Sequence, residues 1–297
     1  MKNLRKFLLV IISVSGSLNS FAQSNLLNAK VPSEIGLKTK AQLISDNDKP
    51  LAYGYVHDRD ILMGKTVWEV IDLSEKINFS LYFPIDENIG SDRKSLYTVL
   101  TTAIKAGKIT EVYSDSYFNT KKSYKDIEAS LFRIDTTDAG REELNSGKKK
   151  VSPQYILRSE LTAQDVTMYK VKGFWYFDKR QSEMKYRLLG ICPVTPDVYT
   201  MNSDEKDYIE LFWIFLPNAR DILHEAKAFN DKNSSMPISF DKILNSRRFN
   251  SLIYKEENIY GDREIKEYMK ENAQNQLLES ERVKEKIRNF EQDMWNY

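Results

Sequence analysis

The chain has 297 residues, with 44 lysines and arginines against 43 aspartates and glutamates, a formal net charge of +1. This near-neutral balance supplies no bulk field to attract nucleic acid or acidic lipid, so nucleic-acid binding is not expected. The single cysteine, Cys192, excludes an internal disulfide, and the two histidines, His57 and His224, stand in no zinc-binding spacing. No Gly-x-Ser-x-Gly elbow or phosphate-binding loop is present. We therefore expect no catalytic residues, no metal and no cofactor.

The first 22 residues have the pattern of a secretory signal peptide. A basic start precedes an apolar stretch at 7–14, and a small-x-small cleavage site ends at Ala22. We predict cleavage between Ala22 and Gln23, so that the chain is exported. The apolar stretch is too short to span a bilayer core of about 30 Å, which makes an uncleaved anchor the less favoured alternative. No cysteine directly follows the stretch, so no lipid anchor is expected on this chain.

Residues 23–60 are mostly polar and lack sustained periodicity, and we predict an extended N-terminal arm with a short strand at 51–56. Order is expected from Ile61 onward, so that 61–297 forms the folded domain. Within it, residues 66–73, which include Trp68, are predicted as a strand or a strand-to-helix turn, and a second short strand is predicted at 109–113.

Three helices are indicated by apolar spacing and by capping residues. The first is predicted to be capped by Ser91 and to end at Gly107, with an apolar stripe of Leu96, Val99, Leu100, Ala103 and Ile104. The second is indicated by the spacing of Tyr124, Ile127 and Leu131. The third is a short capped helix at residues 239–244.

Two segments lack periodicity and are predicted as loops or turns. Residues 135–151 are rich in Thr, Gly, Lys and Glu, which favours a solvated loop and a possible internal domain boundary. The residues Pro217, Asn218 and Asp221 are predicted to mark turns.

The densest apolar region, residues 166–217, predicts an antiparallel β meander. Aromatic runs at 174–177 and 211–216 are too costly to expose, since each large ring buries about 150–250 Å². Between them a period of two indicates a third strand, with one face formed by Met184, Tyr186, Leu188, Gly190, Cys192 and Val194. Short links between three strands favour antiparallel pairing. The aromatic rows are interpreted as core, and a sugar-binding cleft is the alternative.

The C-terminal region is predicted as one long helix that opens at Asp262 and runs to Tyr297, because this range contains no glycine and no proline. Its docking stripe is Val283, Ile287, Phe290 and Met294. The predicted fold class is therefore α+β, an antiparallel meander with flanking helices and a long C-terminal helix. The structural core candidates are Trp68, Trp175, Phe177, Cys192, Trp213, Phe215 and Phe290.

Several of these segments together resemble the gliding-motility family GldN, called PorN in non-gliding relatives, of the type IX secretion system of the Bacteroidota. The matching segments are collinear over residues 60–297, and the arm carries little of the likeness. They are VWEVIDLSEKIN at 67–78, WYFDKR at 175–180, LFWIFLP at 211–217, RRF at 247–249 and ERVKEKI at 281–287.

The resemblance implies a periplasmic, non-enzymatic scaffold that is associated with the outer membrane only through a partner. Family members form a large ring with an outer-membrane lipoprotein, the K component, so that several copies of the chain are expected in one assembly. They also meet the periplasmic part of the M component, which joins a motor in the inner membrane. The family has no catalytic motif to carry over.

Two other classes of function are kept as alternatives. A periplasmic enzyme or cell-wall-binding module would use the aromatic rows as a cleft, and a set of acids with a histidine in one pocket would favour it. A periplasmic chaperone would need long paired helices, whereas this sequence predicts a single helix longer than about 20 residues.

Overall fold

The computed structural model describes residues 31, 49–85, 94–147, 152–201, 203, 205–229, 238–270 and 272–295. The chain divides between Lys49 and Pro50, and everything below concerns the second unit, which extends to Tyr297 as one compact body. The predicted signal peptide, the cleavage site between Ala22 and Gln23, and almost all of residues 23–49 lie outside the described residues.

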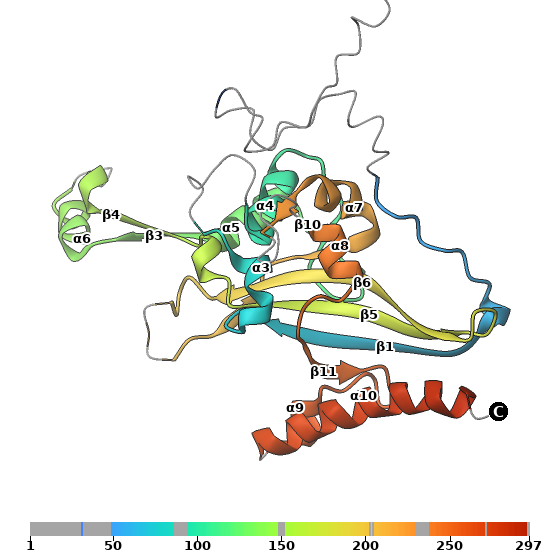
Figure 1. The fold of residues 1–297 in the computed structure, drawn as a ribbon. Coiled ribbons are helices and arrows are strands. Elements are labelled where there is room, and N and C mark those ends of the chain that lie inside the picture. The colour runs from blue at the N-terminus through green and yellow to red at the C-terminus, as the bar shows by residue number, and fades with distance from the viewer. Residues whose placement is uncertain are drawn as a thin grey trace, which may run out of the picture. The chain divides into compact units, whose positions relative to one another are not determined.

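A seven-stranded antiparallel sheet forms the centre of the fold (Figure 1), with the strand order β11-β1-β5-β6-β8-β2 and with β7 paired to β6. Its long strands are β1 (Ile61–Asp72), β5 (Met168–Asp178) and β6 (Glu183–Pro196). Its short strands are β2 (Val112–Tyr113), β7 (Tyr208–Glu210), β8 (Trp213–Phe215) and β11 (Leu252–Glu256). The predicted α+β class and the meander of β5, β6 and β8 are confirmed.

A bulge in β6 changes which side chains share a face of the sheet. Lys172 pairs with Gly190 but Gly173 pairs with Leu188, so Leu189 is the extra residue. A one-residue insertion moves the following side chains to the opposite face. Leu188 lies in the main core, whereas Cys192 lies in a separate cluster on the other face. The predicted single face from Met184 to Val194 is therefore wrong, because the bulge breaks the alternation.

Helices cover the face that carries Leu188. They are α4 (Leu96–Lys105), α7 (Leu216–Glu225) and α8 (Phe240–Asn245), and they lie together on one side of β5 and β6 in Figure 1. Their apolar side chains form the main core with the sheet, including Leu100, Leu223, Phe240, Ile191 and Ile214. Fully burying each such side chain stabilises the fold by about 1.5–3 kcal/mol.

The capping residues of these helices agree with the sequence in two of three cases. Ser239 caps α8, and Gly107, with φ of +69°, provides the predicted left-handed end of α4. The cap of α4 is Ser95, whose side chain accepts from the Thr98 N–H, and the predicted cap Ser91 lies outside the described residues. The turn predicted at Pro217 is also wrong, because Pro217 lies in the first turn of α7, where no N–H is required.

The prediction of a loop at residues 135–151 is wrong in part, because the segment contains the end of a strand and a helix. The helix α5 (Tyr124–Leu131) leads into β3 (Phe132–Thr136), α6 (Asp138–Asn145) follows, and β4 (Ile156–Glu160) returns antiparallel to β3. We call β3, α6 and β4 the projecting ribbon, because Figure 1 shows it extending away from the sheet. A ribbon that buries little apolar surface shows little hydrophobic periodicity, which explains the wrong prediction.

The C-terminal region contains two helices where one was predicted. They are α9 (Ile265–Tyr268) and α10 (Ala273–Trp295). Asp262, at φ of +58°, lies before α9 rather than inside a helix. The docking stripe is confirmed for Val283 and Ile287, which are buried against Val67 and Ile253.

The remaining elements are short. They are α3 (Phe79–Tyr82), the two-stranded pair β9 (Lys227–Ala228) and β10 (Ile238–Ser239), and the 3-10 turns Asp58–Asp60, Lys76–Asn78, Pro153–Tyr155 and Ala163–Asp165.

Truncation before Val283 is expected to make the protein insoluble or protease-sensitive, because Val67 and Ile253, which are almost fully buried, would become exposed. The truncation would also disrupt the helix around Ser280, whose hydroxyl accepts a hydrogen bond from the Ile253 N–H at 2.9 Å. Limited proteolysis and thermal melting measure the effect. A chain ending at Met294 serves as control, since Trp295 is exposed. An unchanged melting temperature of the chain that ends before Val283 would show that α10 does not stabilise the monomer.

Candidate binding groove

The structure separates the predicted core residues into three environments. Trp68, Cys192 and Trp213 form one buried cluster, which Tyr113, Phe118 and Tyr254 partly cover. Phe177 is buried with its ring 5.8 Å from that of Phe290 on α10, and Trp175 is half-buried. Phe215 is half-buried, with its ring 5.3 Å from that of Phe118. The row at 211–216 therefore lines no open cleft.

Cys192 is expected to react slowly with thiol reagents, since it is fully buried and burial holds the pKa of its thiol well above the usual value. Cys192→Ala is expected to cost about 1 kcal/mol of packing and to leave function unchanged. Labelling of the native protein with a maleimide, followed by mass spectrometry, tests the first expectation. Rapid labelling without denaturant would contradict burial.

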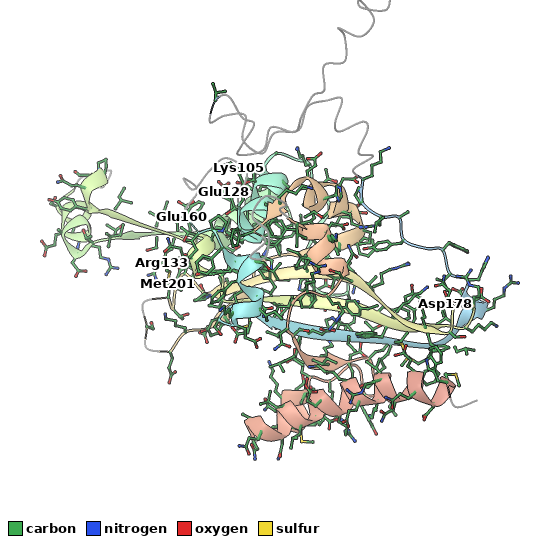
Figure 2. All side chains as sticks on the ribbon, in the orientation of Figure 1. Lys105, Glu128, Arg133, Glu160, Asp178 and Met201 are labelled. Atoms are coloured by element: carbon green, nitrogen blue, oxygen red, sulfur yellow. The ribbon has the colours of Figure 1, made fainter. Side chains whose placement is uncertain are left out.

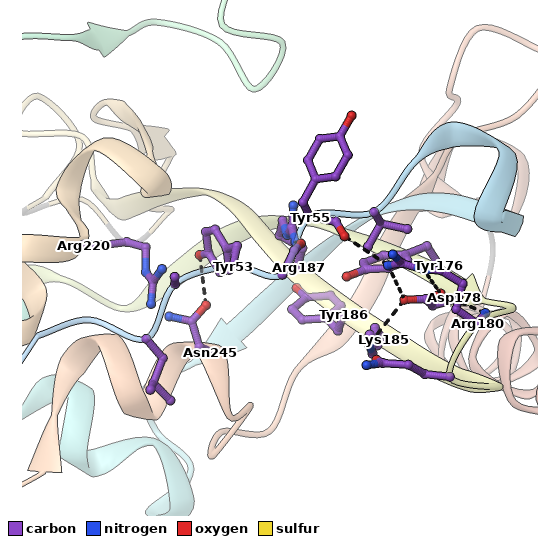
Figure 3. Close-up of a pocket in the computed structure, with 15 residues that line it drawn as sticks. Tyr53, Tyr55, Tyr176, Asp178, Arg180, Lys185, Tyr186, Arg187, Arg220 and Asn245 are labelled. Carbon is purple, nitrogen blue, oxygen red and sulfur yellow. Dashed lines mark hydrogen bonds and ion pairs between the residues drawn. The ribbon is translucent and has the colours of Figure 1, made fainter.

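A groove lies at the end of the β5–β6 hairpin, where the chain enters the domain (Figure 3). It encloses about 600 Å³, in the range of ligand-binding pockets. Residues 51–56 form one wall, and β5, β6, α7 and α8 supply the rest. The lining side chains are aromatic and cationic: Tyr53, Tyr55, Tyr176, Tyr186, Arg180, Lys185, Arg187 and Arg220. Asp178 is the one acidic residue among those that line it.

Residues 51–56 form no strand, contrary to the prediction. Side chains hold this segment in place of ladder hydrogen bonds: Arg187 Nη2 donates to the Gly54 carbonyl and Arg180 Nη2 donates to the Tyr55 carbonyl, each at 3.0 Å. The Tyr53 hydroxyl donates to Asn245 Oδ1 on α8, also at 3.0 Å. The segment is therefore an extended wall that side chains attach to the domain.

Tyr53 lies beside two guanidinium groups. The Arg220 guanidinium lies 4.1 Å from the centre of the Tyr53 ring and that of Arg187 lies 4.6 Å from it. Arg220 also forms a bidentate pair with Asp241, at 2.8 and 3.0 Å, which raises the pKa of Arg220. The ring and the ion pair together orient both arginines.

The far end of the groove holds a second charged cluster. Arg180 donates to both carboxylate oxygens of Asp178 at 3.2 Å, and its Nε lies 3.4 Å from Asp60. Lys185 lies 3.5 Å from Asp178. The hydrogen bond from Arg180 is the main cause that lowers the pKa of Asp178. The Asp178 carboxylate, which is labelled in Figure 2, therefore stays ionised and keeps Arg180 engaged.

A buried network adjoins the groove through Tyr186. Arg247 donates to both oxygens of Glu69 at 2.9 Å, Ser251 donates to the same carboxylate, and Glu69 is fully buried. The Arg247 guanidinium lies 4.1 Å from the centre of the Tyr186 ring. Arg247 therefore joins the end of α8 to β1, and does not offer a free phosphate-binding cation.

The groove offers binding chemistry. Within the described ranges, no group of three or more His, Cys, Asp and Glu side chains is placed to hold a metal ion. His57 is exposed, in edge contact with Tyr55, and His224 lies on α7 and is not among the residues that line the groove. No helix in the part of the chain that the structure describes is long and apolar enough to cross a membrane.

Sequence reasoning missed the groove residues. Tyr53 and Tyr55 flank Gly54 within a segment predicted as an arm, and a pair of aromatic residues in a polar segment was the one available signal. Arg187 and Arg220 lie among many other charged residues and carry no such signal.

The structure is thus that of an α+β domain with one large antiparallel sheet and a cationic, aromatic groove. Comparison with protein families then identifies it: the chain belongs to the family of the gliding motility associated protein GldN, whose model matches residues 56–296. The resemblance found in the sequence is thereby confirmed, and it makes the chain a component of the gliding-motility and type IX secretion machinery. No curated protein matches the chain.

Proposed function

We propose that this protein is a non-enzymatic periplasmic scaffold of the type IX secretion and gliding machinery. After cleavage of residues 1–22, copies of the chain assemble with the K-component lipoprotein into a ring under the outer membrane. The ring contacts the periplasmic part of the M component and transmits force from the inner-membrane motor. The observation that carries the proposal is the family match over residues 56–296.

The projecting ribbon supports a role in assembly. Ile134 is 61% exposed and Ile156 is 40% exposed, and the register of this two-stranded sheet places both side chains on one face. An isolated two-stranded ribbon is marginally stable in water, and apolar side chains on its surface favour contact with another protein. A scaffold that carries force needs a packed interface, because exposed salt bridges contribute only about 0–1 kcal/mol each. We infer that the ribbon contributes to such an interface.

Deletion of the gene is expected to block export of cargo with a type IX C-terminal signal and to leave ordinary periplasmic export unchanged. Proteomics of the medium and of the periplasm measures both. Because an assembly component is needed for the whole pathway, the expected loss affects every such cargo. Continued cargo export in the deletion strain, with no paralogue present, would refute the proposal.

Complementation of the deletion strain tests the ribbon separately. A gene carrying both Ile134→Glu and Ile156→Glu is expected to fail to restore export, because two charges would enter a packed apolar contact on one face of the ribbon. The matched control is Ile259→Glu, since Ile259 is 91% exposed and lies outside the ribbon. Equal restoration by both genes would show that the ribbon forms no interface.

A further inference from the structure

We propose that the groove beside residues 51–56 binds an extended acidic segment of a partner protein, with one carboxylate paired to Arg187. The inference rests on the proposed function only in taking the ligand from another protein of the assembly. It adds a site on this chain and the chemistry of the segment that fits it.

Arg187 differs from the other cations that line the groove, because its orientation does not depend on a carboxylate. Within the described part of the chain, no acidic group lies within ion-pair distance of it, and its hydrogen bond goes to the Gly54 carbonyl. Its guanidinium lies 4.6 Å from the centre of the Tyr53 ring and 5.8 Å from that of Tyr176. A stacked guanidinium presents its remaining N–H groups as a planar fork that matches a carboxylate.

The neighbouring charges leave the groove cationic. Arg220 is paired with Asp241, and Arg180 is shared between Asp178 and Asp60. Among the described residues, the ion pair of Lys185 is with Asp178, which Arg180 already engages. Four cations thus face three carboxylates, and the excess lies at Arg187, near the buried Tyr176 ring and the half-buried Tyr186 ring. A carboxylate entering this site meets a net positive field with limited access of water.

The shape of the site favours polypeptide over a free anion. Arg180 and Arg187 already hold the main-chain carbonyls of Tyr55 and Gly54, so the groove accommodates an extended chain (Figure 3). Residues 183–188 of β6 pair with β5 on one side, and β8 joins β6 only from Gly190 onward. In the described structure the other side of this half of β6 therefore has no paired strand, which is the arrangement that extended peptides use when they bind beside a sheet.

The test uses the full chain purified from its host and a fluorescein-labelled peptide, Thr-Val-Glu-Val-Glu-Thr, with a blocked C-terminus. Fluorescence anisotropy measures its dissociation constant and that of the matched peptide with glutamine in place of glutamate. We expect the acidic peptide to bind about tenfold more tightly or better, as a charge-assisted hydrogen bond predicts. Equal affinity of the two peptides, or no binding of the acidic peptide up to millimolar concentration, would overturn the proposal.

A matched pair of variants tests the residue. Arg187→Gln is expected to weaken binding of the acidic peptide by about tenfold or more and to leave the glutamine peptide unaffected. The control is Arg263→Gln, because the Arg263 guanidinium lies 4.7 Å from the Tyr260 ring and 5.8 Å from that of Tyr268, almost the same surroundings outside the groove. Thermal melting of both variants checks that they fold. Unchanged peptide binding by Arg187→Gln would overturn the assignment.

Two further results distinguish this inference from a site for free anions and from the proposed scaffold function. Displacement of the peptide by inorganic phosphate at equal concentration would indicate a site for free anions and would overturn the peptide assignment. Peptide affinity is measured on the purified chain and does not depend on export of cargo. A deletion strain that still exports cargo would therefore refute the proposed scaffold function and leave the peptide-binding result intact. Failure of the peptide to bind would refute the groove assignment and leave the proposed scaffold function unaffected.

Discussion

Arg247→Met is expected to lower the free energy of unfolding by about 3–5 kcal/mol, because it leaves the fully buried Glu69 carboxylate without its guanidinium. The Ser251 hydroxyl would remain as a neutral partner, and one hydroxyl does not offset the cost of a buried charge. Urea unfolding, followed by circular dichroism, measures the loss.

Two further variants make this expectation specific to the ion pair. Arg248→Met changes the adjacent, exposed arginine and is expected to alter stability by about 0.5 kcal/mol or less. The double variant Glu69→Met with Arg247→Met removes both charges and is expected to recover most of the lost stability, since buried pairs are often replaceable by apolar side chains. Equal stability of the Arg247→Met and Arg248→Met proteins would show that the pair contributes nothing.

Trp213→Ala is expected to cost about 3–5 kcal/mol and to lower the amount of protein in cells. The side chain is fully buried and packs against Cys192 and Trp68 on the face opposite the main core. Its Nε1 also donates to Glu210 at 2.7 Å, a carboxylate that pairs with Lys170 at 2.7 Å. The substitution therefore removes a large ring and a partly buried hydrogen bond together.

Trp295→Ala is the matched control for this prediction, because Trp295 is 69% exposed at the end of α10. Thermal melting and quantitative blotting of both variants measure stability and abundance. We expect the Trp295 variant to resemble the parent protein. A Trp213→Ala protein that is normally stable and abundant, but inactive, would assign this tryptophan to a ligand or partner surface.

The elements that could be predicted are those whose stabilising contacts repeat along the sequence. The helix α4 shows an apolar residue at every third or fourth position because one face packs on the sheet, and α5 and α8 show the same signal. The meander was predictable because its aromatic runs, and the period of two between them, indicate strands. The family was recognisable for a related reason: its segments are collinear over most of the chain.

The wrong predictions arose where local pattern and packing disagree. Ser91 and Ser95 are equally suitable as caps, and the actual start of α4 decided between them. Residues 138–145 form a helix on the projecting ribbon, where little burial produces little periodicity. The bulge at Leu189 leaves no mark in composition, yet it places Cys192 and Leu188 on opposite faces of the sheet.

The sequence by itself determined the α+β class, the meander, the helices α4, α5, α8 and α10 and the family, since these depend on periodicity and on ordered motifs. Tertiary structure alone decided the sites. Glu69 and Arg247 are 178 residues apart, and the groove joins Arg187 to Tyr53 across a separation of comparable size. Such pairs meet only through strand order, register and the docking of α8. No local pattern encodes these, because their free energy comes from contacts between segments that are distant along the chain.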